Sequence, residues 1–186
     1  SLIHYSSLTL LPVLFLSNKP FNKKTTILFL CAIPLGYVVY YAGGSILMNP
    51  SLPFIGNKLA IYQAAVEKGK MTVGINIFDP LHIMSIMLFY YLFLFKDSLT
   101  KLCDDFPILL KTSAIGLSLY SALAFLPVLA LRTSQLYCIV NILLYTYIIY
   151  TFKQKWIGIS MVVVISLLLL YVSIPHYGLG MMIIPN

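Results

Sequence analysis

The chain has 186 residues, of which 60% are apolar and 9% are charged, with a mean hydropathy of +0.94. A soluble domain carries about 25% charged residues, so a water-soluble globule is excluded. The net charge of +7 is spread over loops between apolar runs, which argues against a nucleic-acid partner. Five acidic residues and three cysteines without a C-x-x-C pair lead us to expect no metal and no cofactor.

Six apolar stretches approach the length of about 20 residues that a helix needs to cross a bilayer. Because lipid offers no partners to bare backbone, each stretch is expected to be helical. The sequence therefore predicts an all-α, polytopic membrane helix bundle that forms one transmembrane domain, residues 1–186. The predicted spans are Leu2–Leu16, Thr25–Ile46, Ile75–Phe95, Phe106–Leu131, Leu136–Phe152 and Trp156–Pro175.

Basic residues predict the orientation of these spans, since Lys and Arg accumulate on the cytoplasmic side. The loops after the first, third and fifth spans, together with Lys111, hold eight of the twelve basic residues. This bias places the N-terminus, the 50–74 loop and Arg132 on the outer face. Within that long loop, the helical spacing of apolar residues in Lys58–Lys70 predicts a short helix on the outer surface.

Arg132 is the only arginine and follows the fourth predicted span. Its guanidinium could bind a phosphate or carboxylate with two parallel hydrogen bonds at the outer surface. An anchor to lipid headgroups is the simpler interpretation, and position alone favours it.

Polar residues below Arg132 allow two interpretations. Gln135, Cys138, Asn141 and Tyr145 follow one another at spacings of three or four, which predicts one helix face. That face is either the wall of a polar groove or a set of hydrogen bonds that hold helices together. The fourth span offers further polar groups at similar depth, namely Ser113, Ser118, Tyr120 and Ser121.

Two histidines are candidates for proton transfer. His4, near the outer end of the first span, is either an interfacial residue or a general base that could also hold a phosphate. His82 follows Asp79 by three residues, which predicts a local pair or, less often, an acid/base dyad. Nucleophile-elbow, phosphate-loop and zinc-protease motifs are not present.

Four segments share a pattern when they are taken in chain order. They are His4-Tyr5-Ser6-Ser7-Leu8; Lys58-Leu59-Ala60-Ile61-Tyr62 followed by Gly69; Arg132-Thr133-Ser134-Gln135-Leu136-Tyr137; and Ile183-Ile184-Pro185. Together they resemble the C-terminal half of the EpsG/Wzy-like family of bacterial polysaccharide polymerases, although Cys138 stands where the family usually has an aromatic residue. Because the chain opens without Met, we expect it to be part of a longer protein.

The resemblance implies a metal-independent glycosyltransferase that joins undecaprenyl-diphosphate-linked repeat units of O-antigen, capsule or exopolysaccharide. It places the protein in the bacterial cytoplasmic (inner) membrane, with the bilayer, a chain-length regulator and a flippase as further expected partners. Arg132 would bind the diphosphate, and His4 would deprotonate the acceptor hydroxyl or hold the same diphosphate. The expected substrate-binding residues are Lys58, Tyr62, Gln135, Tyr137 and Asn141.

Other functions stay open at this point. The family's N-terminal half, with an outer-face Arg and a Gly-x-Asp motif, has no counterpart here, so the fragment alone is expected to be inactive. A lipid-linked glycan flippase is the main alternative, but the deep parts of the last two spans hold no ionisable groups other than tyrosines. A membrane acyltransferase and a structural membrane subunit are the remaining alternatives.

Overall fold

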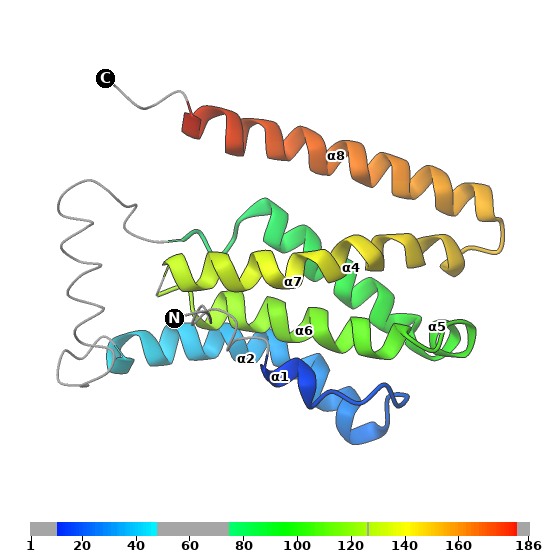
Figure 1. Cartoon of the computed structure of the whole chain (residues 1–186), viewed down its shortest axis with the longest axis horizontal. Helices are drawn as coiled ribbons and strands as arrows, with labels where there is room; N and C mark the ends of the chain where they lie inside the picture. Colours follow the sequence, from blue (N-terminus) through cyan, green and yellow to red (C-terminus); the bar gives the residue numbers. More distant parts are fainter. Residues whose placement is uncertain (1–10, 48–74, 126, 182–186) are drawn as a thin grey trace, which may run out of the picture.

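The computed structural model describes residues 11–47, 75–125 and 127–181, and every regular element in these ranges is a helix (Figure 1). The all-α fold class is therefore confirmed. In chain order the elements are α1 (Leu11–Leu14), α2 (Lys23–Leu47), α4 (Pro80–Leu94), α5 (Lys96–Leu102), α6 (Phe106–Ala122), α7 (Pro127–Tyr147), the 3-10 turn η2 (Ile148–Thr151) and α8 (Lys155–Met181).

Five of the six predicted spans fall on these helices. By length and composition, α2, α8 and the combination of α7 with η2 can each cross a membrane. The helices α4 and α5 meet at Phe95 with a bend of 76° and pass the same test together, which makes three to four candidate spans among the described residues. Most of the first predicted span, and the predicted surface helix in residues 50–74, lie outside the described residues.

The predicted boundary between the fourth and fifth spans is wrong. The helix in the fourth predicted span is α6, which ends at Ala122, nine residues before Leu131. The next helix, α7, begins at Pro127. Proline has no N–H to donate to a carbonyl one turn back, and it disfavours a helical conformation in the residue before it. Its fixed φ suits the first helical position instead, so Pro127 starts α7 and Arg132 lies inside that helix.

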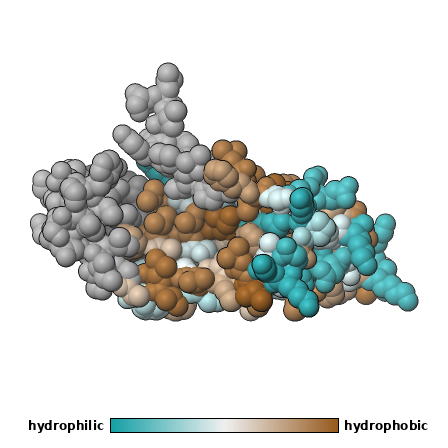
Figure 2. All heavy atoms as spheres, turned by 90° about the horizontal axis from the view of Figure 1, so that it is seen from below, coloured by the Kyte–Doolittle hydropathy of each residue, from teal (hydrophilic) through white to brown (hydrophobic). Residues whose placement is uncertain are grey.

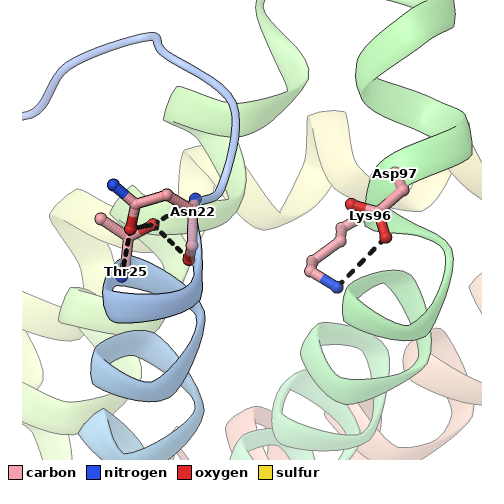
Figure 3. Close-up of polar contacts among 4 residues, drawn as sticks. All are labelled: Asn22, Thr25, Lys96 and Asp97. Carbon is pink, nitrogen blue, oxygen red and sulfur yellow. Dashed lines mark hydrogen bonds and ion pairs between the residues drawn. The ribbon is translucent and has the colours of Figure 1, made fainter.

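Two local contacts lie at the same end of the bundle, beside the start of α2 and the start of α5 (Figure 3). The backbone N–H of Asn22 donates to Thr25 Oγ1, and the backbone N–H of Thr25 donates to Asn22 Oδ1, both at 2.8 Å. This reciprocal cap satisfies two donors at the start of α2. The Lys96–Asp97 ion pair, at 3.5 Å, is solvent-facing on its acidic side and contributes little to stability.

The centre of the bundle is α6, which packs against α2 on one side and α7 on the other and is crossed by α4. Glycine allows the close approach of α6 to α2 and of α6 to α7. A Cβ at Gly36 of α2 would lie 2.5 Å from the Ser118 carbonyl oxygen, and a Cβ at Gly116 would lie 2.4 Å from Tyr137 Cβ. Membrane helices associate mainly through such close packing, because lipid is as apolar as their side chains.

The last helix, α8, differs from α6 because its apolar side chains are mostly exposed. It contacts chiefly η2, with a smaller contact to α4, and Leu167 is 61% exposed. Figure 1 shows α8 lying along the outside of the bundle. Exposed apolar residues of this kind suit a lipid environment rather than water.

Charge gathers at one end of the molecule. Figure 2 shows a hydrophobic middle and a hydrophilic end, and Figure 1 places the start of α2, α5 and the α7–α8 connection at that end. We call it the lysine-rich end, defined by Lys19, Lys23, Lys24, Lys96, Lys101, Lys153 and Lys155. The loops predicted to be cytoplasmic thus lie together; which end faces the cytoplasm stays a prediction.

Candidate functional site

The predicted site residues from Arg132 to Asn141 all lie in α7 and are divided between two of its faces. Arg132 is the sixth residue of this helix, and its side chain is exposed, as is that of Gln135. Tyr137 and Asn141 are only 3% and 8% exposed and belong to the face that packs on α6. We call these the outer and inner faces of α7.

The prediction that Gln135 and Asn141 share one face is therefore wrong. A helix turns about 100° per residue, so two successive steps of three residues shift the face by about 120°. Asn141 lies nine residues after Arg132, which places it about 180° around the helix. This could have been predicted from the sequence, because the small rotation at each spacing of three or four residues adds up over successive steps.

The inner face makes helix-to-helix contacts. Ser113 Oγ of α6 donates to Asn141 Oδ1 at 2.7 Å, and both residues are buried. Tyr137 lies against Gly116, where only a glycine leaves room. These contacts favour the interpretation of the polar residues as packing contacts. A substrate-binding role for Tyr137 and Asn141 stays a prediction.

Two further serines of α6 connect it to its other neighbours. Ser118 Oγ donates to the carbonyl oxygen of Ala32 in α2 at 2.7 Å. Ser121 Oγ lies 3.1 Å from His82 Nε2 in α4. The central helix therefore forms at least one buried or partly buried hydrogen bond with each of α2, α4 and α7.

The sequence predicted a local pair of His82 with Asp79, but it did not predict that His82 contacts α6 across the bundle. His82 is buried, and its ring lies 4.3 Å from that of Tyr120 in addition to its contact with Ser121. The antiparallel register between α6 and α7, fixed by the Ser113–Asn141 contact, places Ser121 level with Thr133. His82 thus lies at nearly the same level as Arg132 along the bundle. His82 is in the core, whereas Arg132 is exposed.

Lys111 connects the start of α6 to the α1–α2 loop. Its Nζ donates to the carbonyl oxygens of Ser17 and Lys19 at 2.6 and 2.7 Å and lies 5.1 Å from the centre of the Phe21 ring. A buried ammonium needs such partners, because a charge without them is costly to bury. The Lys111 side chain thus extends toward the end of its helix, where its ammonium group binds carbonyl oxygens of the α1–α2 loop.

Three predicted site residues cannot be placed relative to Arg132. His4, Lys58 and Tyr62 lie outside the described residues, so their predicted roles stay predictions. Of the described lysines and arginine, only Arg132 lies on the end of the bundle away from the lysine-rich end. Within the described ranges, it is the one residue at that end that could bind an anion with a permanent charge.

The fold and the charges of the described residues define a helical membrane protein with an exposed arginine at the end of the bundle away from its lysine-rich end. The EpsG family model matches residues 1–185, and the chain belongs to the EpsG family. Membership gives it a polymerase-type role in polysaccharide biosynthesis. No curated protein and no solved structure matches the chain.

Proposed function

We propose that this protein joins lipid-linked oligosaccharide repeat units at the outer face of the bacterial cytoplasmic membrane, with undecaprenyl diphosphate as the carrier. The observation that carries the proposal is the exposed Arg132 on the end of the bundle away from the lysine-rich end. If the lysine-rich end is cytoplasmic, Arg132 is available where a diphosphate headgroup would lie on the outer side. EpsG family membership supports the polymerase-type role.

In this proposal Arg132 acts on the leaving group. The acceptor hydroxyl oxygen attacks the anomeric carbon of the donor unit, and the carbon–oxygen bond to the diphosphate breaks with its electron pair going to the diphosphate. A fixed guanidinium offsets the charge that develops there, and it does so with two parallel hydrogen bonds. His4 accepts the hydroxyl proton, or holds the same diphosphate.

The other proposed contacts follow from position. Gln135 lies one turn from Arg132 on the outer face and can donate to the same headgroup. Lys58 and Tyr62 would line the glycan path. A chain-length regulator and a flippase are proposed partners, since polymerisation on the outer side requires delivery of repeat units and control of their number.

The test is a gel of surface glycans from cells that lack the complete gene and from cells complemented with it. Single-repeat glycans in the deletion, with ladders restored by the wild-type gene, are the expected result. Loss of all surface glycan would contradict the proposal and favour an export step. Ladders of normal length in the deletion would also contradict it.

Orientation is tested separately with an impermeant thiol reagent, in a background lacking the native cysteines. A cysteine at Phe125, in the α6–α7 turn, should react in intact cells, whereas one at Lys19, in the α1–α2 loop, should react only after lysis. Position 133 is unsuitable, because Thr133 is fully buried. The reverse pattern would place Arg132 on the cytoplasmic side and contradict the proposed site.

A further inference from the structure

Below Arg132, the outer face of α7 carries a straight row of exposed apolar side chains. The row consists of Leu136, Ile139 and Leu143, at four, seven and eleven residues from Arg132. Each lies within about 40° of the arginine around the helix. Their exposed fractions are 37%, 64% and 48%. We call this row the α7 stripe.

The stripe leads into a groove between α6 and α7. The groove has a volume of about 470 Å³ and is lined by the apolar side chains of Ile108, Leu109 and Leu143. Its other lining residues, nearer the lysine-rich end, are Cys103, Asp105, Thr146, Tyr147 and Tyr150. Leu143 belongs to both the stripe and the groove. At 1.5 Å per residue, the path from Arg132 to Leu143 is about 16 Å long and runs from the arginine end toward the lysine-rich end.

We infer that the α7 stripe and this groove hold the hydrocarbon chain of a lipid whose phosphorylated head lies at Arg132. The inference rests on the proposed function for the identity of the lipid, a polyprenyl diphosphate. Charge and apolar surface are arranged in the order that such a lipid requires, with a cation at one end and apolar side chains beneath it. Guanidinium and phosphate match in charge and in hydrogen-bond geometry.

The other exposed apolar helices do not offer this arrangement among the described residues. The cations of α2 and α8, Lys23, Lys24 and Lys155, lie at the lysine-rich end. On α7 alone, a described cation lies at the opposite end, directly above exposed apolar residues. Ordinary lipid can cover any of these surfaces, but among the described helices only the outer face of α7 has an exposed arginine at one end of a row of exposed apolar side chains.

Photolabelling tests this inference on the complete protein in nanodiscs of phosphatidylethanolamine and phosphatidylglycerol. The probe is a polyprenyl diphosphate that carries a diazirine in its chain. Labels should concentrate on the peptide that contains Leu136, Ile139 and Leu143, and excess unlabelled polyprenyl diphosphate should remove them. Arg132→Gln should lower this labelling by about tenfold or more, because it removes charge-assisted hydrogen bonds to the head.

Two results would overturn the inference. Equal labelling of α7 and α8, without competition, would mean that the probe contacts the protein as ordinary lipid does. In nanodiscs with a larger share of phosphatidylglycerol, a loss of labelling as strong as that caused by polyprenyl diphosphate would mean that a phospholipid occupies the stripe.

A pair of tryptophan variants tests the path without changing the arginine. Ile139→Trp should obstruct the stripe and reduce specific labelling, and Leu167→Trp on α8 is its control, because the two residues are 64% and 61% exposed. Equal labelling in both variants would contradict the path. The outcomes also separate this inference from the proposed function. Normal glycan ladders from Arg132→Gln with lost labelling would refute only the proposed role of Arg132 in polymerisation, and lost ladders with unchanged labelling would refute only the lipid path.

Discussion

The inner and outer faces of α7 belong to the same helix, but they make different contacts. The inner face carries Tyr137 and Asn141 and is fixed against α6 by a close glycine contact and a buried hydrogen bond. The outer face carries Arg132 and Gln135 above exposed apolar residues and makes no packing contact of this kind among the described residues. We therefore expect the inner face to determine stability and the outer face to determine function.

The comparison shows why hydrophobicity alone does not separate core from surface in this protein. Apolar residues occur on both faces, because lipid takes the place of water outside the bundle. Small residues and satisfied polar groups mark the inner face instead, as Gly116 and Ser113 show on the facing helix. An exposed cation marks the outer face.

The largest expected effect on the comparison comes from Gly116→Leu. Its Cβ alone would lie 2.4 Å from Tyr137 Cβ, so α6 and α7 must separate. Overpacking costs about 1–3 kcal/mol or more, and we expect a strong fall in folded protein. Fluorescence-detected size exclusion of a tagged protein measures this. A monodisperse peak of wild-type height would show that the inner face tolerates separation.

Asn141→Ala should have an intermediate effect. It removes the acceptor of the Ser113 hydroxyl, and interhelical hydrogen bonds of this kind contribute about 1 kcal/mol in membrane proteins. We expect a lower thermal midpoint in detergent, and no further loss of stability when Ser113→Ala is added. Additive losses from the two substitutions would mean that the residues do not act through their shared bond.

Gln135→Ala should have the smallest effect on stability. Its side chain is exposed on the outer face, and surface substitutions usually change stability by less than about 0.5 kcal/mol. The expected result is a wild-type thermal midpoint together with shorter polymer, since the proposed headgroup contact is lost. A lowered midpoint with normal polymer would place Gln135 with the inner-face residues.

Much of the fold was predictable because helix length and hydrophobicity are local properties. Five of the six predicted spans fall on helices, and three to four of the described helices can cross a membrane. Pro127 could have corrected the boundary before α7, since proline favours a first helical position. The separation of Gln135 from Asn141 was also within reach of helix geometry. The contacts of Ser113 with Asn141 and of Ser121 with His82 were not, because a single sequence does not show which helices are neighbours.

The most direct test of the central claim compares Arg132→Lys with Asn141→Ala in deletion cells, with glycan ladders measured at matched amounts of membrane protein. Lysine keeps the charge but not the planar fork that binds phosphate in two places. We predict that Arg132→Lys shortens or abolishes the ladder at normal protein abundance, and that Asn141→Ala gives normal ladders once abundance is matched. Normal ladders from Arg132→Lys, or short ladders from Asn141→Ala at matched abundance, would contradict the assignment of function to the outer face of α7.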